Sequence, residues 1–207
     1  MSELTADQRE RLVGQLSRAR ELGFLGPGPV EPHLEHALVF VDALDGVEGT
    51  VVDLGSGGGL PGLVVAAARP DLHLVLLDAR AVRCRFLEEA VGALELAATV
   101  VEGRAEEAGR GPLRGVAAAV VARSFGSPGA TAECGAPLLA PGGRLVVSEP
   151  PDAAPSRWPA EGLARLGLVD QGTLRRPRAT VRVLVLHRAC PAIYPRRDGL
   201  PAQRPLF

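Results

Sequence analysis

A glycine-rich turn that follows a short apolar run most constrains the fold of this chain. Residues 50–54 read Thr-Val-Val-Asp-Leu, a short run rich in β-branched residues, and they lead directly into Gly-Ser-Gly-Gly-Gly at 55–59. Residues 60–68 have helical composition, and Pro61 suits the first turn of a helix because its missing N–H had no partner there. Since glycine lets the backbone turn sharply and lie against a ligand, the stretch predicts a binding loop between a strand and a helix. A plain tight turn is the simpler alternative.

Apolar runs alternate with helical patterns along the rest of the chain. Strands are expected at 50–54, 73–77, 98–101, 117–121, 144–147, 168–173 and 181–187, with a turn at 142–143. Helices are expected at 5–21, 32–44, 60–68, 80–96, 131–139 and 160–166. This order predicts an α/β fold with a mostly parallel seven-stranded sheet and helices on both faces. The last two strands follow each other closely and predict an antiparallel final strand, as in the Rossmann-like class I methyltransferase fold.

The 207 residues are enough for one α/β domain with a sizeable core. We expect an N-terminal helical extension at 1–46, a ligand-binding methyltransferase domain at 47–190 and a C-terminal surface tail at 191–207. The hydrophobic fraction of 46% and the net charge of −1 are typical of a soluble globular protein. No apolar run approaches the roughly 20 residues that span a bilayer, and the polar N-terminus does not resemble a secretory signal. A cytoplasmic monomer without a membrane partner is expected.

The cysteines, histidines and arginines limit which disulfides, metal sites and cationic binding groups the chain can form. The three cysteines are scattered, so no disulfide framework is expected. His33 and His36 lie three apart on an expected helix without companion ligands, so no metal site is expected. All 23 basic residues are arginines, so any cation that binding requires must be a guanidinium.

The residues around the loop favour S-adenosylmethionine (SAM) over a dinucleotide. A dinucleotide fingerprint reads Gly-x-Gly-x-x-Gly, and here Gly55 and Gly57 fit but Leu60 stands at the third glycine position. The carboxylate of Asp53 would oppose a pyrophosphate, whereas it favours the positively charged ammonium and sulfonium groups of SAM. An NAD-dependent enzyme is the alternative.

Three further positions follow strands, at the sheet edge where α/β folds bind ligands. Asp78 ends the second strand, where an acid binds ribose hydroxyls; a helix N-cap is the simpler alternative, and the two roles are compatible. Glu106 follows the third strand, in the loop expected beside the adenine, with a helix-start acid as its alternative. Arg123 follows the fourth strand and points over the same edge.

Several motifs together resemble the bacterial RsmG family, also called GidB. They are the loop at 53–62, Leu-Asp-Ala-Arg at 77–80, Arg-Cys-Arg-Phe-Leu at 83–87, Gly-Arg-Ala-Glu at 103–106, Ala-Arg at 122–123 and the tail at 194–206. These enzymes use SAM to methylate N7 of a guanine in small-subunit (16S) ribosomal RNA. The resemblance covers most of the chain from residue 50 onward. It implies a SAM-dependent rRNA methyltransferase whose partner is the 30S subunit.

The resemblance also implies roles for individual residues at the strand ends. Contacts to SAM are implied for Gly55, Leu60, Asp78, Ala79, Arg80, Ala105, Glu106 and Arg123. Of these, Asp78 with Ala79 and Arg80 holds the ribose, Ala105 and Glu106 border the adenine, and Arg123 lies between cofactor and RNA. No residue is expected to act as a catalytic acid or base, because N7 of guanine carries a free lone pair and catalysis is mostly alignment.

The sequence departs from the family on the substrate side. The N-terminal part is short and lacks the family's usual Trp-Asn and Asn-Leu-Thr segment. Residues 124–128 read Ser-Phe-Gly-Ser-Pro where the family has an alanine-rich, leucine-containing loop. Glu149 stands where a lysine is typical, and an acid there is expected to repel phosphate.

Arg123, Arg196 and Arg197 are expected to bind RNA phosphates. Two alternatives are open, and the acid at position 149 makes the first of them plausible. One is a methyltransferase paralogue with a different substrate, and the other is a non-catalytic SAM- or RNA-binding factor in ribosome assembly.

Overall fold

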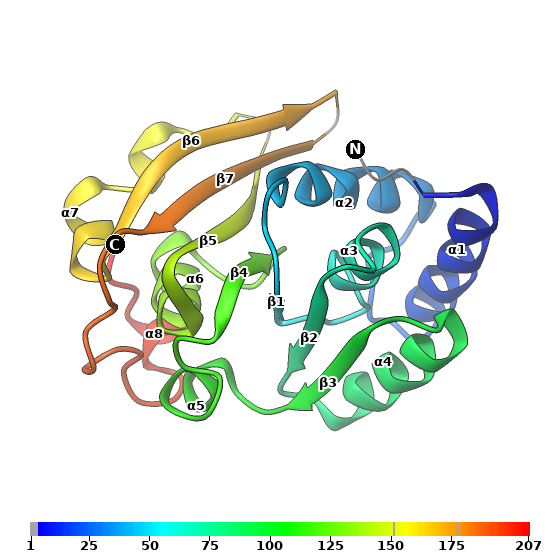
Figure 1. The fold of residues 1–207 in the computed structure, drawn as a ribbon, viewed down its shortest axis with the longest axis horizontal. Coiled ribbons are helices and arrows are strands. Elements are labelled where there is room, and N and C mark those ends of the chain that lie inside the picture. Colours follow the sequence, from blue (N-terminus) through cyan, green and yellow to red (C-terminus); the bar gives the residue numbers. More distant parts are fainter. Residues whose placement is uncertain (1–3, 151, 178) are drawn as a thin grey trace.

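Seven strands form one twisted sheet within the residues that the computed structural model describes, 4–150, 152–177 and 179–207 (Figure 1). The strands are β1 (Thr50–Leu54), β2 (His73–Asp78), β3 (Ala98–Glu102), β4 (Ala117–Ala122), β5 (Leu139–Glu149), β6 (Leu168–Arg176) and β7 (Ala179–Leu186). Their order is β3-β2-β1-β4-β5-β7-β6. The first five pair in parallel, whereas β7 is antiparallel to both β5 and β6. The predicted sheet, with its antiparallel ending, is confirmed.

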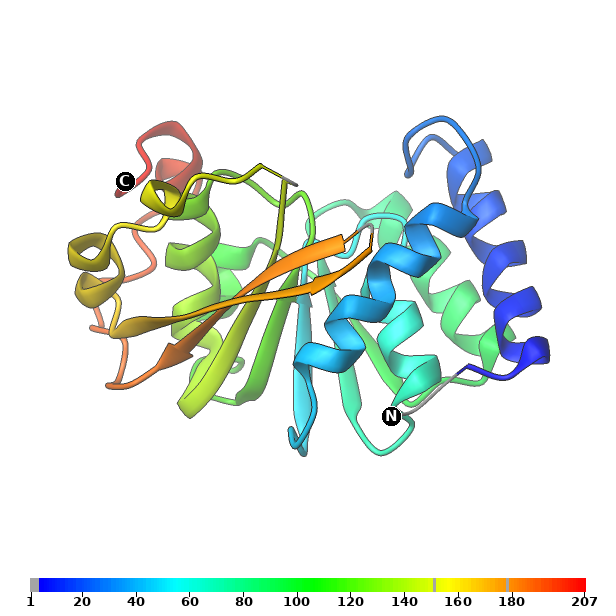
Figure 2. The same cartoon turned by 90° about the horizontal axis from the view of Figure 1, so that it is seen from above.

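Helices cover both faces of this sheet. They are α1 (Ala6–Glu21), α2 (Glu31–Ala43), α3 (Gly62–Ala68), α4 (Ala81–Leu94), α5 (Ala105–Arg110), α6 (Pro128–Gly135), α7 (Ala160–Arg165) and α8 (Leu200–Gln203). Figures 1 and 2 show α1, α3 and α4 gathered around β1–β3 and α5–α8 around the other half of the sheet, while α2 packs against α3, β6 and β7. Alternate residues of β1 face opposite ways, since Val51 packs with α2 and α3 and Val52 with α6. None of the described helices is long and apolar enough to cross a membrane.

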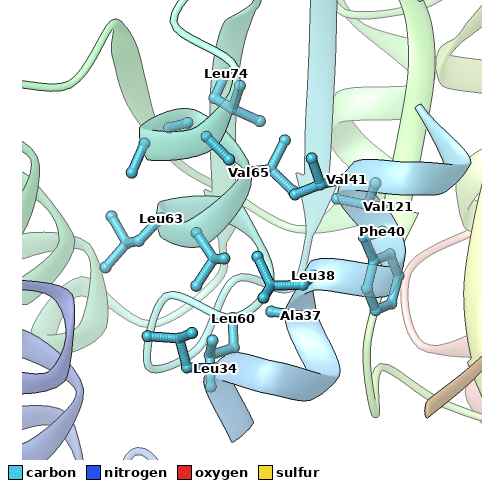
Figure 3. Close-up of a cluster of buried hydrophobic side chains, with 14 of the residues drawn as sticks. Leu34, Ala37, Leu38, Phe40, Val41, Leu60, Leu63, Val65, Leu74 and Val121 are labelled. Carbon is cyan, nitrogen blue, oxygen red and sulfur yellow. The ribbon is translucent and has the colours of Figure 1, made fainter. Parts of the chain in front are cut away.

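The two N-terminal helices pack into the same core as the sheet. A capping box begins α1, in which the Gln8 N–H donates to Thr5 Oγ1 and the Thr5 N–H donates to Gln8 Oε1. In Figure 3, Leu34, Leu38 and Val41 of α2 lie in one apolar cluster with side chains from α3 and the sheet. The core on this face therefore depends on residues that precede the first strand.

Several local boundaries differ from the sequence-based expectations, and α5 and α8 were not expected. The helix expected at 131–139 begins earlier, at Pro128, because Ser127 Oγ accepts from the Ala130 N–H, and it ends at Gly135. The turn expected at 142–143 lies inside β5 as an irregularity in its pairing with β4, where Gly142 has φ +80°. Pro61 stands at the N-cap of α3, one residue before the first turn.

We predict that Leu34→Ala lowers the free energy of unfolding by about 2–5 kcal/mol, because it leaves a cavity at a fully buried position. The matched control is Leu22→Ala, whose side chain is 49% exposed at the end of α1. The measurement is chemical unfolding of both variants, and equal losses of stability would contradict the buried placement of α2.

Candidate functional site

The glycine loop runs from the end of β1 to α3 and lies against the end of β2. Gly55, Gly57 and Gly59 have φ values of +74°, +57° and +92°, a region that residues with a Cβ rarely adopt. The backbone N–H groups of Gly55 and Ser56 both donate to the carbonyl oxygen of Leu77, at 2.9 and 3.0 Å. A Cβ added to Gly55 would lie 2.6 Å from Phe125 Cδ2. The loop therefore needs its glycines both for its turns and for close contact with a ring.

Asp53 lies beneath this loop, fully buried. Its Oδ2 accepts from the Gly62 N–H at 3.0 Å, whereas its Oδ1 has no hydrogen-bond partner among the described residues. Burial raises the pKa of this carboxyl to about 7. A charged Asp53 thus costs stability in the ligand-free chain and is suited to a nearby positive charge.

Asp78 joins the glycine loop to the end of β2. Its Oδ2 accepts from the Gly57 N–H at 2.8 Å and lies 3.6 Å from the guanidinium of Arg83. Its Oδ1 accepts from the Arg80 N–H at 3.0 Å, just before α4. The N-cap position itself belongs to Arg80, so the alternative in which Asp78 is the N-cap is wrong, although its carboxylate does order the start of that helix.

Two cavities flank the loop. The first, of about 150 Å³, brings together Gly55, Asp78, Ala79, Ala105 and Glu106, five of the residues chosen from sequence. The second, of about 310 Å³, holds three more, Gly57, Leu60 and Arg123, with Gly55 common to both. Asp53 and Arg80 are not among the lining residues of either cavity.

The C-terminal segment forms one wall of the smaller cavity, through Pro201 and Ala202. Glu106 holds it there, because its Oε1 accepts from the Gly199 N–H at 2.8 Å and from Arg104 at 3.1 Å. Figure 1 shows this segment, in red, beside α5 and α6. Residues 191–207 were expected to lie over the surface, and here part of them encloses a cavity.

The two tail arginines have different surroundings. Arg196 forms a two-bond ion pair with the fully buried Glu133, at 2.8 and 2.6 Å, and its backbone N–H donates to the same carboxylate. Arg197 is exposed. The guanidinium of Arg196 is thus held by an internal carboxylate. Of these two tail arginines, Arg197 is the one whose guanidinium is accessible to an RNA phosphate.

Arg123 enters the larger cavity beside α2. One of its N–H groups donates to His33 Nδ1 at 2.7 Å, while Nη1 is buried without a partner among the described residues. Burial lowers the pKa values of His33 and Arg123, and it lowers that of His36 to about 4, with a further contribution from the charge on Arg123. Both histidines are therefore neutral near pH 7, and His33 can accept the bond.

Glu149 does not present its charge to solvent. Its side chain is fully buried, its Oε1 accepts from Trp158 Nε1 at 2.7 Å, and its Oε2 accepts from Arg157 at 3.1 Å. The expectation that this acid repels phosphate is wrong, because the acid is enclosed and paired with a guanidinium.

The comparisons with known proteins decide the family. The GidB family model, described as rRNA small subunit methyltransferase G, matches residues 28–149, more than half of the chain. This chain belongs to the GidB family. Ribosomal RNA small subunit methyltransferase G of Mycobacterium sp. (strain KMS) is 35% identical over 194 residues, which cover 89% of this chain and 85% of that protein.

Other relatives match more strongly over shorter stretches. The protein of the same name from Salinispora arenicola (strain CNS-205) is 51% identical over 112 residues, 51% of this chain and 46% of the relative. The chain thus spans about half the length of the relatives it matches most strongly, with 46% and 57% covered in two of them.

Solved structures confirm the fold of this GidB protein. A branched-chain polyamine synthase mutein from Thermus thermophilus, in complex with N4-aminopropylspermidine and 5′-methylthioadenosine, matches with a TM-score of 0.65 at 19% identity, over 91% of this chain and 66% of that one. A geranyl diphosphate methyltransferase in complex with SAM matches with a TM-score of 0.56 at 14% identity, over 73% and 84%.

Sequence reasoning missed several residues that line or support these cavities. Phe125 lies against Gly55 and borders the smaller cavity, and Pro201 and Ala202 close it from the far end of the chain. His33 was considered in the sequence only as a metal ligand, whereas in the structure it accepts a hydrogen bond from Arg123. An aromatic residue in the loop directly after β4 was a usable signal for Phe125, whereas no local pattern points to Pro201.

We predict that Arg196→Gln lowers the melting temperature by several degrees, because it leaves Glu133 buried without its ionic partner, at a cost of about 1–3 kcal/mol. Arg197→Gln is the matched control and leaves the melting temperature within about one degree. Thermal unfolding measures both. Equal melting temperatures would show that Arg196 does not anchor the tail.

We also predict that Asp53→Asn reduces the pH dependence of stability. Between the ordinary aspartate pKa of 3.8 and the raised value of about 7, the folded chain retains a proton that the unfolded chain has released. Stability contributed by this group is therefore complete at low pH and is lost as the pH rises through about 7. Thermal unfolding at pH 5 and pH 8 measures the loss.

The Asp53→Asn variant loses less stability between these pH values than the wild type, by about 1 kcal/mol or more, or about 2–4 °C in melting temperature. The exposed Asp45→Asn variant behaves as the wild type. A wild-type pH profile that matches the profile of Asp53→Asn would contradict the burial of a titrating carboxyl.

Proposed function

We propose that this chain is a SAM-dependent methyltransferase that modifies N7 of a guanine in small-subunit (16S) ribosomal RNA. The observation that carries the proposal is the glycine loop tied to Asp78, with a cavity on each side. Family membership and the printed names of the relatives support the activity. We further propose a cytoplasmic enzyme that works as a monomer on the 30S subunit.

The residues present fit SAM. Arg123 lines the larger cavity and has a buried Nη1 without a described partner, which suits the carboxylate of SAM. Asp53 lies beneath the loop outside both cavities, and a nearby ammonium or sulfonium would favour its charged form. Asp78 lines the smaller cavity with both oxygens already fixed by backbone N–H groups, which orients it toward ribose hydroxyls. The small side chains of Ala79 and Ala105 leave room beside it for a flat ring.

Glu106 has a revised role in this proposal. Its Oε1 is occupied by Gly199 and Arg104, so it acts first by holding the tail against the cofactor cavity. The adenine ring then contacts both Glu106 and the cavity wall formed by Pro201 and Ala202.

Bound SAM supplies an electrophilic methyl group, and N7 of guanine supplies its own lone pair, so no residue has to remove a proton. The work of the chain is to bind both partners and hold them in line. The loop and Asp78 fix one partner, and Arg123, half-buried in the lining of the larger cavity, adds a positive charge there.

The test uses the purified chain, tritiated SAM and 30S subunits from cells without this gene. We expect label in 16S rRNA that maps to N7-methylguanine. Label found only in a molecule other than rRNA would show that rRNA is not the substrate. SAM binding without any labelled product would show that the chain is a non-catalytic factor.

Asp78→Asn is the matched variant for the cofactor site. We expect SAM affinity to fall at least roughly tenfold, since one charge-assisted acceptor is lost, whereas Asp45→Asn leaves it unchanged. Isothermal titration measures both affinities. Full affinity in the Asp78→Asn variant would contradict the proposed ribose contact.

A further inference from the structure

A third cavity, of about 340 Å³, lies on the other side of the segment that follows β4. It shares Arg123 and Ser124 with the larger loop cavity and Phe125 and Gly126 with the smaller one. The three cavities thus meet around residues 123–126. A group that enters the third cavity can approach whatever is bound beside the glycine loop.

The charged groups that line this cavity leave it positive. They are Arg123 and Arg157, opposed by Glu149, while His36 has a pKa of about 4 and is neutral near pH 7. The Glu149 side chain is fully buried, whereas 34% of the Arg157 side chain is exposed. What the cavity presents to an incoming ligand is therefore the arginine and not the acid.

Glu149 also fixes the position of that arginine. Its two oxygens hold Arg157 Nη1 and Trp158 Nε1 at 3.1 and 2.7 Å, so adjacent residues are anchored on one carboxylate at the end of β5. A guanidinium has five N–H donors, more than the single bond to Glu149 uses. The remaining donors suit a phosphate, which an arginine can bind through two bonds.

Aromatic side chains complete the cavity. Phe125 is half-buried and lies on Gly55, and the Trp158 ring is held by Glu149 and by an edge contact with Phe207 at 6.3 Å. Rigid rings beside a cation are the combination that binds an unstacked nucleotide, with stacking for the base and a guanidinium for its phosphate.

We infer that the third cavity is the acceptor-side nucleotide subsite, in which Arg157, positioned by Glu149, binds a phosphate of the RNA strand while Phe125 packs against the base. This inference rests on the proposed function. It names Arg157 as the contact residue and Glu149 as a positioning residue.

The test compares Arg157→Gln with Arg165→Gln, an exposed arginine on α7 that lies outside the three cavities. We expect Arg157→Gln to raise the KM for 30S subunits roughly tenfold and to reduce the slope of log KM against log salt by about 1. The Kd for SAM stays within about twofold of the wild type in both variants. Arg157→Lys, which retains a charge, recovers part of the salt dependence.

The Glu149→Gln variant tests whether Glu149 positions Arg157 or only stabilises the fold. It keeps an acceptor for Trp158 but loses the charge that holds Arg157, so we expect a higher KM for 30S subunits with unchanged SAM affinity. Because both residues act through one contact, the double variant is no worse than Arg157→Gln alone.

The inference is overturned if Arg157→Gln matches Arg165→Gln in KM and salt slope, or if it weakens SAM binding as much as RNA binding. Wild-type protein that transfers no methyl group to rRNA overturns the proposed function and this inference together. Wild-type transfer with an unaffected Arg157 variant removes only this inference.

Discussion

The hydrogen bond from the Gly57 N–H to Asp78 is the contact on which the candidate site depends. It joins the carboxyl ends of two adjacent parallel strands, β1 and β2, and it forms only because glycine permits the left-handed turns of the loop. The same loop covers Asp53, whose buried carboxyl lacks a second partner among the described residues. One short turn therefore sets both the shape of the site and its unbalanced charge.

Buried acids organise the other half of the molecule. Glu106, Glu133 and Glu149 each pair with an arginine, and each ties a later segment of the chain to the sheet or its helices. Since all basic residues are arginines, the guanidinium fork serves internal structure as well as any ligand. A count of arginines near the sheet edge accordingly overstates how many face outward, as Arg196 illustrates.

Local patterns predicted the fold well, because strand alternation, capping residues and glycine turns are encoded within a few residues of each other. The strand, glycine loop and helix that begin at β1 are an example. The partner of Glu133, 63 positions away at Arg196, is not encoded locally, and neither is the pairing of Glu149 with Trp158. Loop residues such as Phe125 gain their role only when the cavities around them exist.

The wall formed by Pro201 and Ala202 has a consequence for biosynthesis. All seven strands of the described sheet precede these residues in the chain, so a nascent polypeptide can assemble its sheet while one side of the smaller cavity is still missing. Under the proposed function, binding of SAM then requires that residues 191–207 have been translated and have docked on Glu106 and Glu133. Ligand binding at this cavity would thus follow the formation of the sheet rather than accompany it.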